Sequence, residues 1–150
     1  MVLRTKIASA IIALGLGSVA LAQVSLAQES PSPAGAKVYF VNLKDGDTVS
    51  NPVVIKFGLV GMGVSPAGVD GDLTKGTGHH HLLVNGELKG DALKGAIPAD
   101  DTHRHFGKGQ TEASVTLPPG THTLQLVLAD WSHVPHNPPV MSERIKITVK

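Results

Sequence analysis

After residue 36, apolar and polar side chains alternate with a period of two residues in one segment after another. In residues 53–59, every second side chain is apolar, as in a strand that buries one face, because successive strand side chains point to opposite faces. Residues 37–41, 111–117, 121–129 and 144–150 also have strand character, and no window of this region has a helical period. The pattern predicts an all-β fold over residues 37–150, an immunoglobulin-like antiparallel β-sandwich of about seven strands. A jelly roll or small barrel is the alternative.

The first 27 residues have the layout of a secretory signal peptide. Two basic residues precede an apolar run over residues 7–22, and small residues follow. Cleavage after Ala27 is preferred to cleavage after Ala22, and it leaves residues 28–36 as a polar linker. An uncleaved membrane anchor is the alternative, which the short apolar run disfavours. We therefore expect a periplasmic or secreted protein without stable membrane insertion after processing.

The composition excludes several kinds of partner and ligand. The chain has 13 Lys and Arg, 12 Asp and Glu, and no Cys. The predicted signal peptide contains two of the basic residues and no acid, so the processed chain would have 11 basic and 12 acidic residues. A near-neutral domain without a basic run is a poor candidate for binding nucleic acid. Without Cys, the domain has neither disulfides nor thiolate metal ligands.

The eight histidines are clustered in a pattern that is typical of metal ligands. His79, His80 and His81 lead into a predicted strand, in which His79 and His81 share one face and His80 takes the other. A second pair has the same spacing, and a third pair flanks Val134-Pro135. Neutral imidazoles suit Cu and Zn. The candidate metal ligands are therefore His79, His81, His103, His105, His133 and His136.

Each histidine also has a structural interpretation. His122 lies on the apolar face of its strand just after a turn, where its ring is expected to hydrogen-bond the backbone. The Asn85-Gly86 signal predicts a two-residue hairpin in which Leu83 and Leu88 would pair in the core. His79 and His81 would then lie at the rim of that core. Residues 61–78, 89–110 and 130–139 show no period and are expected to be loops. Loops of this length are often functional.

Sequence motifs for catalysis are missing. The chain has no Gly-x-Ser-x-Gly, no His-Glu-x-x-His and no phosphate-binding glycine motif. Thioether coordination of copper is also poorly supported, because only Met62 and Met141 remain after processing. We predict no catalytic residues and a domain that is not an enzyme.

Several dispersed motifs resemble one bacterial family. In chain order they are Gly61-Met62-Gly63-Val64, Gly78-His79-His80-His81-Leu82-Leu83, His105-Phe106-Gly107, Gly109-Gln110-Thr111-Glu112, Leu117-Pro118-Pro119-Gly120-Thr121-His122-Thr123-Leu124, His133-Val134-Pro135-His136 and Ser142-Glu143-Arg144. Together they are similar to the bacterial domain of unknown function 4399 family over residues 37–150. The resemblance implies a secreted, β-rich domain and no particular activity. Residues 38–53 alone also resemble the opening of periplasmic immunoglobulin-like copper-resistance domains.

These observations favour a non-enzymatic periplasmic domain that binds Cu or Zn through its histidines. The competing hypothesis is a cell-envelope interaction or adhesion module with structural histidines, which would contact an envelope protein through Met62, Phe106 and Trp131. A metal-dependent enzyme is a third hypothesis, and it would need an open coordination position beside a pocket.

Overall fold

A computed structural model describes residues 30–69 and 75–150. The predicted signal peptide over residues 1–27 lies outside these residues. Among the described residues, no helix is long and apolar enough to cross a membrane. The elements are short strands and a 3₁₀ helix: β1 (Lys37–Phe40), β2 (Thr48–Val49), β3 (Val53–Val60), β4 (Gly63–Val64), β5 (Thr77–Val84), η2 (Gly90–Lys94), β6 (His103–Phe106), β7 (Glu112–Val115), β8 (Gly120–Ala129), β9 (Pro135–Met141) and β10 (Ile145–Val149).

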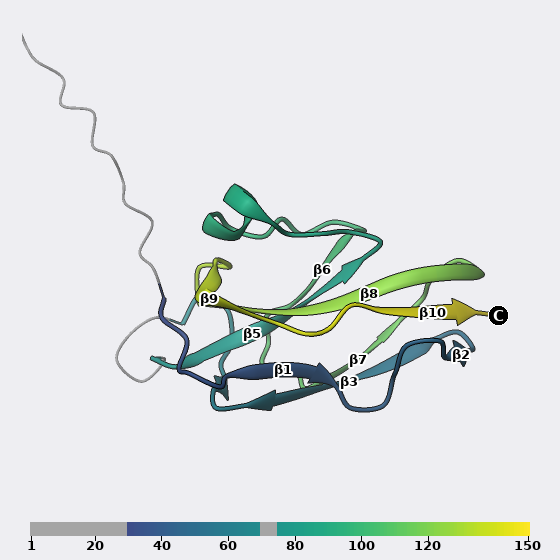
Figure 1. The fold of residues 1–150 in the computed structure, drawn as a ribbon, viewed down its shortest axis with the longest axis horizontal. Helices are drawn as coiled ribbons and strands as arrows, with labels where there is room; N and C mark the ends of the chain where they lie inside the picture. Colours follow the sequence, from purple (N-terminus) through teal and green to yellow (C-terminus); the bar gives the residue numbers. More distant parts are fainter. Residues whose placement is uncertain (1–29, 70–74) are drawn as a thin grey trace, which may run out of the picture.

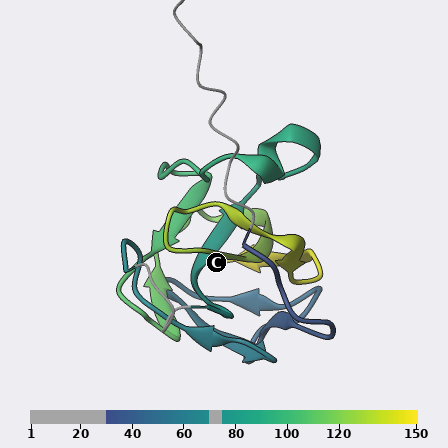
Figure 2. The same cartoon turned by 90° about the vertical axis from the view of Figure 1, so that its left-hand side faces the viewer.

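The strands form two facing sheets (Figures 1 and 2). The small sheet has the order β1-β3-β7, and all its pairings are antiparallel. The large sheet has the order β2-β10-β8-β5-β4, with β6 also on β5 and β9 also on β8. Two short pairings, β2 with β10 and β4 with β5, are parallel. The predicted all-β sandwich is confirmed.

The main core fills the space between the sheets, as the alternation of the strands predicts. The small sheet contributes the inward residues Val53, Ile55 and Phe57 of β3, each no more than 6% exposed. The large sheet contributes apolar side chains from β5, β8 and β10. A second, smaller cluster lies on the other face of the large sheet, made of Leu83, Leu88, Ile97, Val127 and Ala129. The chain between β5 and β6 therefore folds back over that outer face.

Several predicted local structures are wrong. The Asn85-Gly86 turn does not make a two-residue hairpin, because β5 pairs with β6, and Leu83 lies opposite His103. Leu83 and Leu88 nevertheless pack in one cluster, as predicted. The segments predicted as loops contain β4, β6 and part of β9. These strands are short, or they carry Pro at a sheet edge, so they lack a readable alternation.

The part of the predicted polar linker that the structure describes contacts the rest of the domain. Residues 30–32 run beside β9: the Asn137 N–H donates to the Ser30 carbonyl at 2.9 Å, and the Ser32 N–H donates to the Asn137 carbonyl at 3.2 Å. Pro31 forms an isolated parallel bridge with Asn137. This contact places the segment next to the loop between β8 and β9.

Candidate metal centre

Strand β5 presents two histidines on the outer face of the large sheet. The His80 ring stacks on Phe57 of the small sheet, with ring centroids 4.8 Å apart, so His80 points into the core. His79 and His81 therefore point the other way, as predicted. All three side chains are 0% exposed. His80 is buried between the sheets, and His79 and His81 are buried on the outer face because neighbouring segments, including those that carry His105 and His133, cover it there. The Nε2 atoms of His79 and His81 are 2.9 Å apart.

The neighbouring strand β6 brings in a third imidazole. His81 and His105 lie directly opposite each other in the antiparallel pairing of β5 with β6. Directly opposed residues share a face of the sheet, and the ring centroids of His105 are 5.0 Å from those of His79 and His81. His105 is the most exposed member of the cluster. It therefore lies where the site meets solvent.

The loop between β8 and β9 supplies the fourth imidazole. The His133 Nδ1 atom lies 3.2 Å from the His79 Nε2 atom, and its ring centroid is 4.8 Å from that of His105. His133 has a φ of 70°, a conformation that residues other than Gly seldom adopt. Hydrogen bonds hold it there: the His133 N–H donates to the Asp130 carbonyl at 3.0 Å, and the Ile97 N–H donates to the His133 carbonyl at 2.9 Å.

The four side chains can hold one metal ion. Each of His79, His81, His105 and His133 offers a ring nitrogen, and these four atoms all lie within 4.8 Å of one another. Tetrahedral coordination with bonds of 2.0–2.1 Å places ligand nitrogens about 3.3 Å apart. The distances of 2.9 and 3.2 Å within the cluster are close to this value. Small movements of the rings would complete the shell.

The environment keeps the cluster in the form that binds metals. Burial, together with the neighbouring His105 and His133, lowers the pKa of His79 to about 4. Burial and the nearby His79 lower the pKa of His81 to about 2. Burial also lowers the pKa of His105. A metal ion needs the neutral imidazole, so these side chains are ready to bind at neutral pH without first losing a proton.

The other two predicted ligands lie outside this cluster. His103 shares β6 with His105, but its Nδ1 atom is 2.9 Å from a carboxylate oxygen of Asp100. His136 is buried, and its Nδ1 atom donates to the Ser30 carbonyl at 3.2 Å. His122 has a structural environment, with its Nε2 atom 2.8 Å from the Pro118 carbonyl and its Nδ1 atom 3.0 Å from the Asn85 side chain. Each of the three predicted pairs therefore contributes one or two histidines to the cluster.

The histidine pattern does not indicate Asp130, which organises the loop around His133. Its carboxylate is 3% exposed, and its Oδ1 atom accepts hydrogen bonds from the Ser132 N–H, the Ser132 hydroxyl and the Val134 N–H at 2.8–3.0 Å. Burial acts to raise its pKa, but hydrogen bonds from Ser30, Ser132 and Val134 outweigh that effect and lower it. The Asp-x-Ser spacing is a local signal for this turn.

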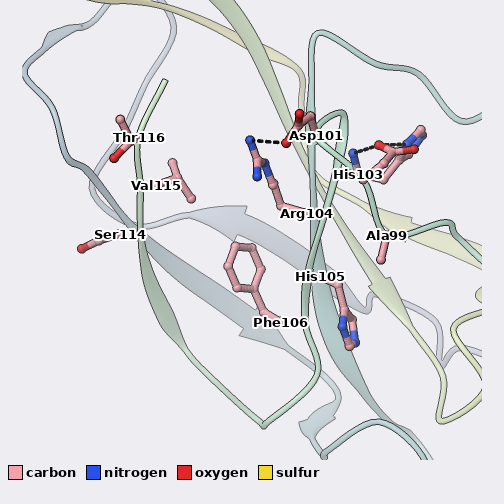
Figure 3. Close-up of a pocket in the computed structure, with 10 residues that line it drawn as sticks. Ala99, Asp101, His103, Arg104, His105, Phe106, Ser114, Val115 and Thr116 are labelled. Atoms are coloured by element: carbon pink, nitrogen blue, oxygen red, sulfur yellow. Dashed lines mark hydrogen bonds and ion pairs between the residues drawn. The ribbon is translucent and has the colours of Figure 1, made fainter. Parts of the chain in front are cut away.

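A groove runs along β6, and its lining includes His103 and His105 as well as Arg104 and Phe106. Arg104 and Phe106 point toward Val115 of β7, whereas His103 and His105 point to the other side of the strand (Figure 3). The groove has a volume of about 820 Å³, and Arg104 pairs with the exposed Asp101 at 3.1 Å. The groove therefore reaches His105, the exposed member of the histidine cluster.

The fold and the cluster define a class of protein: a β-sandwich domain with a histidine site on the outer face of its larger sheet. Residues 55–150 match the model of a family described as a domain of unknown function, DUF4399. The chain belongs to this family. No curated protein and no solved structure matched the chain.

Proposed function

We propose that this domain binds one transition-metal ion, Cu(II) or Zn(II), in the periplasm without acting as an enzyme. The observation that carries the proposal is the convergence of four imidazole nitrogens, from three separate segments, within 4.8 Å. Cu and Zn are among the first-row metal ions that imidazole ligands suit. The periplasmic location rests on the signal-peptide pattern of the N-terminus.

The number of ligands supports binding rather than catalysis. Catalytic zinc sites commonly use three protein ligands and keep the fourth position for water or substrate, whereas structural sites use four. Four histidines would fill a tetrahedral shell. The groove beside Arg104 and Phe106 is also lined by His105 (Figure 3), so it is the filled ligand shell, and not the position of the groove, that disfavours a substrate on the metal.

The experiment is a calorimetric titration of the untagged protein, produced from the full-length sequence, with Zn(II) and Cu(II). We expect one ion per chain, and a His105→Ala variant should bind at least about 10-fold more weakly. His105 is suited to this test because it is exposed and its removal leaves no buried cavity. His103→Ala is the matched control, since His103 lies on the same strand but outside the cluster, and it should bind like the unmodified protein. Equal affinity in both variants would contradict the proposal.

An envelope-interaction module is the second candidate. It is supported by the exposed apolar side chains on the outer face of the small sheet, Tyr39, Val54 and Val60, which are 44–51% exposed. The contact residues that the sequence analysis named for this role, Met62, Phe106 and Trp131, are half-buried. Co-purification of an envelope protein that is lost in a Tyr39→Ser/Val54→Ser variant, with metal binding unchanged, would favour it.

A further inference from the structure

The histidine cluster has one member whose position depends on a loop. His79 and His81 lie on β5 and His105 on β6, so strand pairing fixes their backbones. His133 lies in the turn between β8 and β9, with a φ of 70°. Such a conformation persists only where the surroundings hold it. The groups that hold this turn therefore decide whether the fourth imidazole is in place before a metal arrives.

The buried Asp130 carboxylate is the centre of that turn. Its Oδ1 atom accepts the backbone N–H groups of Ser132 and Val134, the residues on either side of His133, at 2.9 and 3.0 Å. The carboxylate thus fixes the backbone before and after the ligand. Hydrogen bonds to a charged group are stronger than those between neutral groups.

The second oxygen of this carboxylate is held from the other end of the chain. The Ser30 hydroxyl donates to the Asp130 Oδ2 atom at 2.6 Å, across a separation of 100 residues. The Ser30 carbonyl accepts from the Asn137 N–H and from the His136 ring. Residues 30–32, which we call the N-terminal strap, are therefore attached to both ends of the His133 loop, at Asp130 and at the start of β9.

We infer that Ser30 and Asp130 are positioning residues for the metal site, and that the N-terminal strap sets its affinity by fixing the His133 loop. The inference rests on the proposed function for its effect on metal affinity. Ser30 itself contacts no cluster histidine among the described residues; it acts through Asp130. Cleavage at either predicted signal-peptide site, after residue 22 or residue 27, would retain the strap.

Three variants of the full-length protein test the inference. Ser30→Ala removes the hydroxyl bond to Asp130, and Asp130→Asn removes the charge that the turn surrounds. Ser32→Ala is the matched control: it lies in the same strap, and its hydroxyl donates to the Pro138 carbonyl at 2.7 Å rather than to Asp130. Zn(II) is the probe, and a thermal melt of each variant checks that it is folded.

We expect Zn(II) affinity to fall roughly 3- to 10-fold in Ser30→Ala and roughly 10- to 100-fold in Asp130→Asn, with no change in Ser32→Ala. A second measurement requires no metal. In the metal-free protein, the Val134 amide should exchange its hydrogen faster in Ser30→Ala than in Ser32→Ala, because the acceptor of that amide is less firmly held.

The outcomes separate the two ideas. If the unmodified protein binds neither Zn(II) nor Cu(II), the proposed function fails, and hydrogen exchange alone decides whether the strap positions the loop; if it binds Cu(II) alone, Cu(II) replaces Zn(II) as the probe. If the unmodified protein binds zinc and Ser30→Ala binds it equally well, with unchanged exchange at Val134, the inference is overturned while the proposed function stands. Equal weakening in Ser30→Ala and Ser32→Ala would also overturn it, since the effect would then not act through Asp130.

Discussion

Acidification should destabilise the metal-free protein, because three fully buried histidines resist protonation in the folded state. His79, His80 and His81 are each 0% exposed. Burial lowers the pKa of His79 and of His80 to about 4, and the pKa of His81 to about 2. In the unfolded chain these side chains take up protons below pH 6.5, whereas in the folded chain they do not. The free energy of unfolding should therefore fall as the pH drops below 6.5.

The size of the effect follows from the pKa values. A histidine whose pKa is about 4 when folded and 6.5 when unfolded loses about 1.4 kcal/mol of stability per pH unit between those values, or about 2 kcal/mol at pH 5. His80 faces the core, apart from the cluster, so its contribution adds to that of the others. Because His79 and His81 influence each other, we expect a total loss of about 4 to 6 kcal/mol between pH 7 and pH 5. That is comparable to the whole stability of a typical domain.

Urea denaturation at several pH values, in the presence of a chelator, measures this loss. His80→Leu provides the internal comparison, because His80 stacks on Phe57 in the core, apart from the cluster that would bind the metal. The variant should lose about 1.4 kcal/mol per pH unit less than the unmodified protein between pH 6 and pH 4.5. A free energy of unfolding that stays constant from pH 7 to pH 5 would refute the reasoning. Identical slopes in the two proteins would refute it for His80.

Three further predictions concern the metal and the strand that carries its ligands. Zn(II) at about 100 times its Kd should stabilise the fold by about 2.7 kcal/mol and raise the Tm by about 10 °C in scanning calorimetry; an unchanged Tm would contradict a native-state site. Zn(II) affinity of the folded protein should change little between pH 7 and pH 5, because burial lowers the pKa of His79 to about 4 and that of His81 to about 2, so that protons compete for these imidazoles only at lower pH; a steep loss of affinity between pH 7 and pH 5 in protein that is still folded would contradict this. Gly78→Ala should cost about 2 to 4 kcal/mol in a thermal melt, because the new Cβ would clash with the Ala129 carbonyl oxygen; a melt like that of the unmodified protein would show that β5 and β8 can separate without loss.

The part of the site on β5 could be predicted from the sequence, because a period of two residues places His79 and His81 on one face whatever the strand pairs with. The position of His105 could not. Residues 103–106 are all exposed or half-buried at a sheet edge, so they show no alternation. Their partners on β5 lie 20 to 26 residues earlier in the chain (106 − 80 = 26 and 103 − 83 = 20). The apparent hairpin signal at Asn85-Gly86 favoured a local pairing that the chain does not use.

The loop that carries His133 depends in part on distant contacts that no local pattern reveals. Strand β9 begins at Pro135 and contains Pro138 and Pro139, residues that disfavour a strand unless they lie at an edge. The link from Ser30 to Asp130 spans 100 residues, so a polar segment that looks like a linker can serve as part of the site's support. Sequence periodicity reports which face of an element is buried, and it carries no information about such distant polar contacts.

Anomalous diffraction from crystals of the protein grown with Zn(II) would test the central claim most directly. The account predicts one strong peak per chain at the zinc edge, about 2.0–2.1 Å from a ring nitrogen of each of His79, His81, His105 and His133. A zinc ion bound instead at His103 or His136, or fewer than three of the four imidazoles within bonding distance of the peak, would contradict it.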